Sequence, residues 1–162
     1  MQQDKNAFYH RLYQQAAGLF DGERDYQANC ANLAALLFLE LDEINWVGFY
    51  RNVNQELVLG AFQGKPACTR IPTGAGVCGT AAARRESVIV DNVHDFDGHI
   101  ACDGASNSEL VVPVICAGNL LGVLDVDSPV IARFSETDAR GLETLVTLLL
   151  EASDVQAQDL VC

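Results

Sequence analysis

Apolar residues recur at helical spacing near both ends of the chain. Near the N-terminus they fall every three or four residues, as on one buried helix face, and we predict a helix over about residues 5–20. A second helix, rich in Ala and Leu, is predicted over about residues 26–41, with Asp25 as its N-cap. Ser135, followed three residues later by Asp138, has the spacing of a capping box and predicts the start of a closing helix.

Between these helices the pattern changes to short apolar or alternating runs bounded by turn residues, which is typical of strands. An Ala-rich segment in the middle favours one short helix. The expected strands cover about residues 45–51, 56–62, 69–71, 87–90, 110–117 and 120–126, and the short helix covers 77–85.

The order of these elements is helices, a meander of strands and a closing helix, with no internal repeat or linker. A length of 162 residues suits one domain that can bury a sizeable core. We therefore predict an α+β fold in a single domain over residues 1–162. Its central antiparallel β-sheet has about six strands, with the N- and C-terminal helices packed on it.

The composition and net charge limit the kinds of partner that we expect the protein to bind. The formal net charge of −12 argues against nucleic acid and against an anionic membrane surface, because neither attracts an acidic protein. No apolar run approaches the roughly 20 residues that span a bilayer. The first residues lack the basic-then-apolar layout of a signal peptide. We expect a cytoplasmic protein.

The chain contains six cysteines, and in a reducing cytoplasm these do not form a structural disulfide framework. Cys30 lies in a helical pattern and Cys116 in a strand pattern, so both are interpreted as packing residues. Cys162 is the last residue and is given no role. The cysteines that lie beside turn-rich sequence are Cys68, Cys78 and Cys102.

Cys102 lies in a polar stretch from Gly98 to Glu109 and is expected on an accessible loop. Glu109 begins a long apolar strand, and Asp125 and Asp127 end the next one. Carboxylates near a thiol do not help it to ionise, but they can bind a cationic group or give a proton to a leaving oxygen. Crowding also raises the pKa of at least one of them. This combination suits the reduction of a small, amine-bearing oxidised substrate.

Simpler interpretations stay open for each of these features. Asp125 and Asp127 can alternate outward at a strand end, and Glu109 can be a solvated edge residue. The thiols could bind zinc together with His94 and His99, but no Cys-x-x-Cys pair or close His pair is present, and we expect no metal. The glycine-rich turn after residue 72 lacks the Lys-Ser/Thr ending of a phosphate-binding loop.

Several motifs taken together resemble the free methionine-(R)-sulfoxide reductases, which are enzymes built on a GAF domain. The resemblance extends over nearly the whole chain. The motifs, in order, are Gly64-Lys-Pro-Ala-Cys-Thr-Arg-Ile-Pro, Gly76-Val-Cys-Gly-Thr-Ala-Ala, Gly98-His-Ile-Ala-Cys-Asp, Ser108-Glu-Leu-Val-Val-Pro and Gly122-Val-Leu-Asp-Val-Asp-Ser.

The resemblance implies roles for individual residues. Cys102 matches the nucleophile, Cys68 the main resolving cysteine and Cys78 a third redox thiol. Trp46 matches the aromatic residue placed against the methyl group of the substrate, although ordinary core packing would also explain it. The acids that match those holding the substrate and its sulfoxide oxygen are Glu109, Asp125 and Asp127.

The family further implies free methionine (R)-sulfoxide as substrate, thioredoxin as reductant, and neither a metal nor an organic cofactor. A sulfenic acid on the nucleophile and an intramolecular disulfide are the implied intermediates. A homodimer is compatible with the GAF resemblance. The competing functions are a non-catalytic GAF sensor of a small ligand, which needs no loop thiols, and a thiol redox switch, which needs no group of acids.

Strand parity makes the pocket a geometric prediction. A regular two-residue turn at Gly118-Asn119 would place Glu109 opposite Ser128, facing away from both aspartates. A pocket with all three acids requires Glu109 opposite Asp127. We therefore expect a loop of three or five residues, or a β-bulge near Pro113.

Overall fold

The computed structural model describes residues 4–100, 102 and 104–155. These residues form four α-helices, a single 3-10 turn and a six-stranded sheet of order β3-β2-β1-β6-β5-β4, in which every described pairing is antiparallel. The helices are α1 (Lys5–Phe20), α2 (Tyr26–Glu40), α3 (Gly76–Arg84) and α4 (Glu136–Ala152), and the 3-10 turn is η1 (Val93–Asp95). The strands are β1 (Trp46–Val53), β2 (Glu56–Gly64), β3 (Arg70–Pro72), β4 (Val88–Val90), β5 (Ser108–Cys116) and β6 (Asn119–Ser128).

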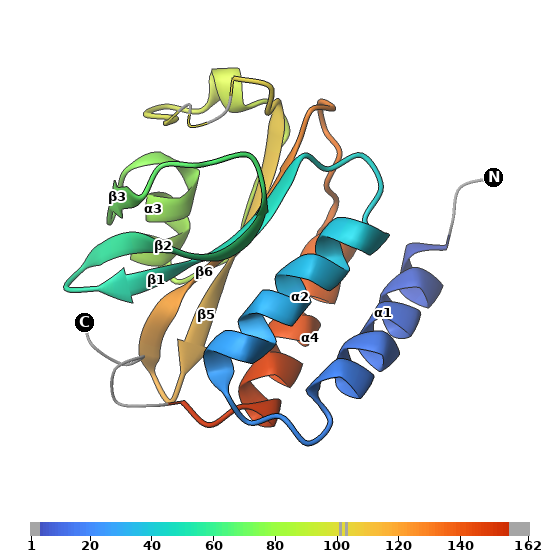
Figure 1. Cartoon of the computed structure of the whole chain (residues 1–162). Helices are drawn as coiled ribbons and strands as arrows, with labels where there is room; N and C mark the ends of the chain where they lie inside the picture. The colour runs from blue at the N-terminus through green and yellow to red at the C-terminus, as the bar shows by residue number, and fades with distance from the viewer. Residues whose placement is uncertain (1–3, 101, 103, 156–162) are drawn as a thin grey trace.

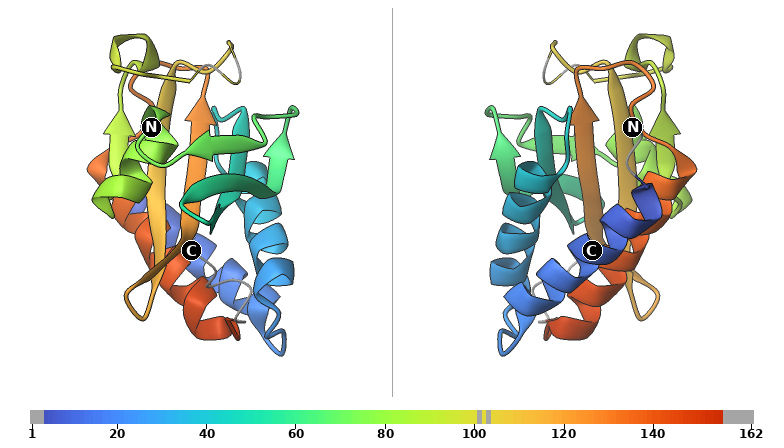
Figure 2. Two further views of the ribbon diagram at one scale, coloured as in Figure 1. Left: turned by 90° about the vertical axis from the view of Figure 1, so that its left-hand side faces the viewer. Right: turned by 90° about the vertical axis from the view of Figure 1, so that its right-hand side faces the viewer.

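The sheet separates two layers of unequal size. Helices α2 and α4 lie against one face with α1 packed on their outer side, while α3 and the loops around it lie over the other face (Figure 1; Figure 2 gives the two side views). This arrangement confirms the predicted α+β fold with N- and C-terminal helices on a central antiparallel sheet. No helix within the described part of the chain is long and apolar enough to cross a membrane.

Each face of the sheet has its own core, because alternate strand residues point to opposite sides. On the side of the three long helices, Leu110, Leu124 and Val126 pack against Leu142 and its neighbours. On the α3 side the core is smaller, and it ends in a pocket. Its buried residues include Trp46, Tyr50, Val77, Cys78, Val111 and Val123.

The helix boundaries follow the predictions closely. Asp25 accepts a hydrogen bond from the Ala28 N–H and caps α2. The Ser135–Asp138 capping box is formed. Asp138 is almost fully buried, and it also accepts hydrogen bonds from the Lys5 Nζ at 2.5 Å and the Tyr9 Oη at 2.9 Å. The capping residue therefore also links α4 to the first helix.

The β5–β6 hairpin confirms the predicted register but corrects the turn. Glu109 lies opposite Asp127, and Val111 lies opposite Asp125. The turn itself is Ala117-Gly118, not Gly118-Asn119, and both of its residues have positive φ, 50° and 81°, as a tight hairpin of this type requires.

With the two-residue turn alone, Glu109 and Asp127 would point to opposite faces of the sheet. A one-residue bulge brings them back to the same face. The register shifts between Val114 and Ile115, where Val114 pairs with Gly122 and Ile115 pairs with Leu120. Leu121 is the extra residue. The bulge lies one residue beyond Pro113, which donates no hydrogen bond to the ladder, so a β-bulge near Pro113, one of the expected alternatives, is confirmed.

Gly122, next to the bulge, offers a stability prediction. A Cβ at this position would overlap the carbonyl oxygen of Tyr50 in the neighbouring strand. Gly122→Ala should therefore lower the free energy of unfolding by about 1–3 kcal/mol, as overpacking does in a tight interior. Gly18→Ala, in an open position on α1, is the matched control and should be neutral or stabilising by up to about 1 kcal/mol. Urea unfolding of both variants measures the difference, and equal stabilities would contradict the close approach.

Candidate active site

The floor of the pocket is a row of side chains across three strands. Trp46 on β1 pairs with Asp127 on β6, which pairs in turn with Glu109 on β5. In the adjacent row Gly48 pairs with Asp125. Because these positions share strand parity, both aspartates and Glu109 face the α3 side together with the indole ring. The structure thus brings together all four residues that the sequence assigns to substrate binding.

Trp46 is held rigidly at one wall of the pocket. Its ring stacks on Tyr50 at 5.9 Å and on Phe62 at 5.4 Å between centroids. Its indole Nε1 donates a hydrogen bond to the Lys65 carbonyl at 3.1 Å. Gly48 leaves room for the ring, since a Cβ there would come within 2.7 Å of it. Trp46 is buried, yet it lines the pocket, so packing and a functional contact are combined in one residue.

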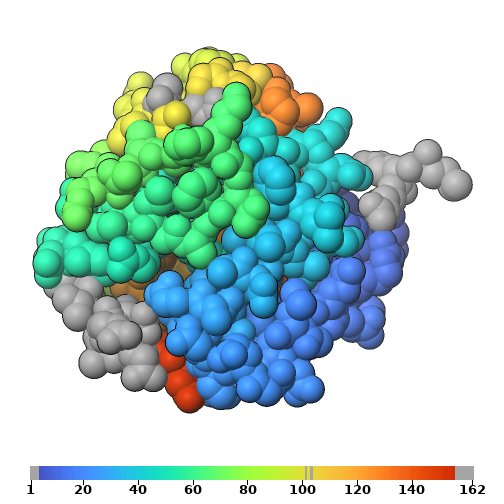
Figure 3. Space-filling view, in the orientation of Figure 1, coloured from blue at the N-terminus to red at the C-terminus, as the bar shows by residue number. Residues whose placement is uncertain are grey.

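Two of the three thiols that the sequence singled out are joined above this floor. Cys68, in the loop between β2 and β3, forms a disulfide with Cys102, and their Cα atoms are 5.5 Å apart. The Tyr50 hydroxyl donates a hydrogen bond to the Cys68 carbonyl at 2.9 Å. The sheet therefore holds the Cys68 loop directly over the pocket. Figure 3 shows the green segment that includes this loop meeting the yellow segment near residue 100 at the surface.

Cys78 differs from the other two thiols. It lies in the first turn of α3, is buried, and stays a free thiol with its Sγ 3.8 Å from the Glu109 Oε1. Burial, followed by the nearby Asp125 and Glu109 carboxylates, raises the pKa of Cys78 well above that of a free thiol. It is therefore a neutral S–H group that faces the acids.

The buried carboxyl groups are poised to carry protons. Burial and the charge of Asp127 raise the pKa of Glu109 to about 8. Burial and repulsion by Glu109 raise the pKa of Asp125 well above its usual range. Within the described residues, the Asp125 Oδ1 has no hydrogen-bond partner. The site thus offers a protonated acid near neutral pH and an unpaired oxygen that faces a pocket.

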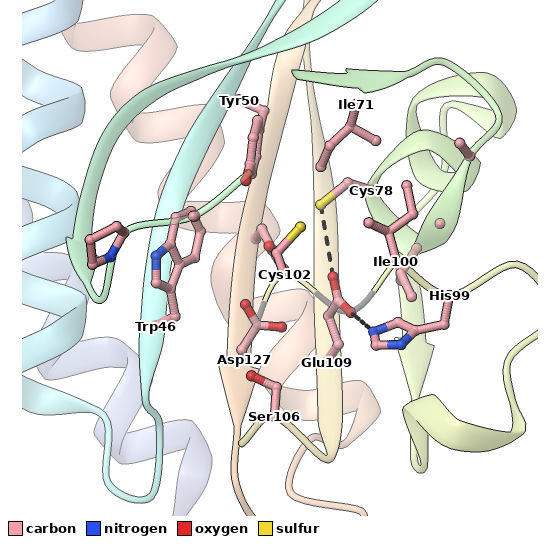
Figure 4. A pocket seen from close by; sticks show the side chains of 16 residues that line it. Trp46, Tyr50, Ile71, Cys78, His99, Ile100, Cys102, Ser106, Glu109 and Asp127 are labelled. Atoms are coloured by element: carbon pink, nitrogen blue, oxygen red, sulfur yellow. Dashed lines mark hydrogen bonds and ion pairs between the residues drawn. The ribbon is translucent and has the colours of Figure 1, made fainter. Parts of the chain in front are cut away.

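His99 is the second polar neighbour of the Glu109 carboxyl group. Its Nε2 lies 3.8 Å from the Glu109 Oε2, on the side opposite to Cys78 (Figure 4). Sequence reasoning considered His99 only as a zinc ligand and missed this contact. The available signal was its position three residues before Cys102 in the same loop.

The pocket is bounded by the sheet, by the start of α3 and by both thiol-bearing loops. Gly76, Val77 and Cys78 contribute the first turn of α3, where backbone N–H groups have no acceptor within the helix. The lining residues are Trp46, Tyr50, Pro66, Ala67, Ile71, Ala75, Gly76, Val77, Cys78, His99, Ile100, Cys102, Ser106, Glu109, Asp125 and Asp127.

The metal-ligand set considered from sequence is not the one that the structure assembles. His94 Nε2 lies 3.0 Å from the Asn107 Oδ1, and Cys68 and Cys102 are used in the disulfide. Cys78, Glu109 and Asp125 have donor atoms within 4.8 Å of one another and are the described groups that could hold an ion. The same three groups can also act without an ion, as two acids and a thiol.

Comparison with known proteins shows which proteins this chain is similar to. The profile of the GAF domain family matches residues 29–152. Free methionine-R-sulfoxide reductase from Escherichia coli K12 is 51% identical over 146 residues, which cover 90% of this chain and 88% of that relative. A solved protein from Burkholderia vietnamiensis, described as a GAF sensor, has a TM-score of 0.89 at 52% identity, covering 93% of this chain and 96% of that one.

A second solved structure carries a ligand. Free methionine-R-sulfoxide reductase from Neisseria meningitidis, in complex with its substrate, has a TM-score of 0.89 at 44% identity and covers 94% of this chain and 92% of that one. The fold and the pocket define a GAF-domain protein that carries a thiol pair over buried acids. Within that class, the chain belongs to the free methionine-R-sulfoxide reductase family.

Proposed function

We propose that this protein reduces free methionine (R)-sulfoxide to methionine. The observation that carries the proposal is the disulfide-forming pair Cys68 and Cys102 placed over a row of acids, Glu109 and Asp127, that ends in Trp46. The activity named for its relatives in Escherichia coli and Neisseria meningitidis supports it. The single catalytic domain is proposed to extend over residues 1–162.

The pocket provides a complementary group for each part of a free amino acid. The ammonium group would bind between Asp127 and the unpaired Asp125 Oδ1. The carboxylate would bind the N–H groups in the first turn of α3, since the N-terminal end of a helix attracts anions. The methyl group on sulfur would lie against Trp46. This arrangement needs both charges of the backbone, which a peptide-bound residue lacks.

The positions of these groups indicate the following reaction, in which atoms, electrons and protons balance. The Cys102 thiolate attacks the sulfoxide sulfur while Glu109, protonated near neutral pH, gives its proton to the oxygen. The protonated oxygen passes from the substrate sulfur to the Cys102 Sγ, so methionine leaves with its sulfur reduced, Cys102 becomes a sulfenic acid, and Glu109 becomes a carboxylate. The Cys68 thiol then condenses with the sulfenic acid, which forms the disulfide and releases water. No step requires a metal or an organic cofactor.

Cys78 is proposed as the slower, second redox thiol. Attack on a sulfenic acid proceeds through the thiolate, and the raised pKa of Cys78 leaves little thiolate at neutral pH. Cys68 is less buried than Cys78, and it is the thiol that forms the disulfide with Cys102. It is therefore the preferred partner of Cys102.

An external dithiol must reopen the disulfide after each turnover, and thioredoxin is the proposed reductant. This requirement matches a reducing compartment, so we propose a cytoplasmic location. A homodimer stays a prediction, and the reaction above needs residues of one chain only.

The test is an assay of methionine release with dithiothreitol and separated substrate epimers. We expect turnover of free methionine (R)-sulfoxide and little or none of the (S) epimer. N-acetylated substrate should be turned over at least about tenfold more slowly, because its amide lacks the positive charge that Asp125 and Asp127 would bind. Comparable rates on the acetylated or a peptide-bound substrate would contradict the proposed binding mode.

A GAF sensor without catalysis is the second candidate, since the Burkholderia vietnamiensis protein carries that description. It predicts that free methionine sulfoxide binds but is not consumed. Binding measured by calorimetry without methionine release by the reduced protein would favour the sensor.

A further inference from the structure

Glu109 is enclosed by two groups of different accessibility. Its Oε1 faces the Cys78 Sγ, and its Oε2 faces the His99 Nε2, both at 3.8 Å. Cys78 is only 4% exposed, and the Glu109 side chain is 8% exposed. The His99 side chain is 15% exposed, on a loop at the edge of the pocket. In Figure 4 the three side chains form a continuous line, with His99 at one end.

The proposed reaction creates a need for proton return. Each turnover transfers one proton from Glu109 to the sulfoxide oxygen and leaves a carboxylate in a buried place. Ionisation of the Cys102 thiol releases a proton to solvent, so the balance closes only if solvent returns one proton to Glu109. A buried acid next to other acids needs a defined route for this proton.

We propose that His99 is the proton relay that returns this proton from solvent to Glu109. The proposal rests on the function proposed above and names a residue that acts on the acid rather than on the substrate. His99 takes a proton from water at one ring nitrogen and gives a proton from Nε2 to the Glu109 Oε2. Nothing is oxidised or reduced in this step.

The ring is suited to this task. Partial burial, with a smaller contribution from His94, lowers the pKa of His99, so its imidazole is neutral near pH 7. A neutral imidazole has one N–H donor and one acceptor nitrogen, and it can pass a proton between them. His94 itself is engaged with Asn107 and does not compete for Glu109.

The other neighbours of Glu109 do not offer a comparable route. Cys78 is only 4% exposed, and burial and the nearby carboxylates raise its pKa, so it gives up its proton less readily than an exposed thiol. Asp125 is also buried and shares the same need for a proton. Asp127, the cross-strand partner, is partly exposed, and a route through it is the competing possibility that the experiment separates.

The experiment is chemical rescue of His99 variants. Methionine release is measured with dithiothreitol raised until the rate no longer depends on it, so that disulfide reduction is not limiting. His99→Ala and His99→Gln should lower this rate by about tenfold or more, a smaller loss than the roughly 100-fold or more expected when the general acid itself is removed. Added imidazole should restore His99→Ala in proportion to its concentration and leave the wild-type rate unchanged.

Two controls make the result specific. Glu109→Gln should keep the same low residual rate with or without imidazole, because there is no acid to reprotonate. His10→Gln, on the exposed side of α1, should behave as wild type. His99 variants with the wild-type rate would overturn the relay and point to Asp127. A lowered rate in both variants that imidazole does not change would assign His99 a structural role and also overturn it. If the wild-type protein itself releases no methionine, the proposed function is rejected instead.

Discussion

Replacing Cys102 by serine should abolish methionine release, even within a single turnover. A serine hydroxyl is a far weaker nucleophile than a thiolate toward sulfoxide sulfur, and neither of the other thiols lies in the place of Cys102. Rapid-quench measurement of methionine formed per enzyme, with enzyme in excess over substrate, gives the result directly. The same variant should still bind substrate, because the acids and Trp46 are on the sheet.

A serine variant of Cys68 separates the reduction of the substrate from the recycling of the enzyme. Cys68→Ser should release about one equivalent of methionine and then slow, because the sulfenic acid on Cys102 loses its preferred thiol. A sulfenic acid trap such as dimedone should label this variant and label the wild type much less. Cys30→Ser and Cys116→Ser are the controls, and neither should alter the first turnover. If Cys68→Ser lost the first turnover while Cys102→Ser kept it, the two roles would be reversed.

Replacing Glu109 by glutamine should lower the rate of the first turnover by about 100-fold or more, the usual contribution of a general acid. The amide keeps the size of the side chain and cannot give up a proton. The donating form of Glu109 is present below its pKa of about 8 and is lost as the pH rises through that value. The ratio of wild-type to Glu109→Gln rates should therefore be constant at lower pH and fall above about pH 8.

This ratio cancels the ionisation of Cys102, which changes the rates of both proteins in the same way. Asp127→Asn is the matched comparison. It removes a charge from the proposed ammonium site and should raise KM more than it lowers the rate of the first turnover. A ratio that does not depend on pH would exclude Glu109 as the proton donor, and Asp125 would then be the next group to test.

Parts of this site that depend on local sequence could be predicted. Strand parity required either an odd-numbered loop or a β-bulge near Pro113 once Glu109 and Asp127 were assigned to one pocket, and the structure has the bulge. The helix ends followed from single capping residues such as Asp25 and Ser135. These features depend on hydrogen bonds and side-chain alternation over a few residues, and such interactions are visible in a sequence.

Features that depend on contacts between distant segments could not be predicted in the same way. The turn at Ala117-Gly118 was misplaced by one residue, because both possible turns contain the same glycine and only the bulge determines which one closes. The hydrogen bond from Tyr50 to the Cys68 carbonyl and the contact between His99 and Glu109 join segments that meet only in the folded chain. The pairing of Cys68 with Cys102 was implied by family resemblance, not by spacing.

The acids and Trp46 stand on strands whose register is fixed by the sheet, whereas Cys68 and Cys102 stand on loops. Loops change their residues and lengths more readily in evolution than paired strands do. A descendant that lost both loop thiols would keep the pocket and become a receptor for free methionine sulfoxide. The double variant Cys68→Ser, Cys102→Ser is therefore a starting point for a biosensor, with the fluorescence of Trp46 as a built-in signal of occupancy.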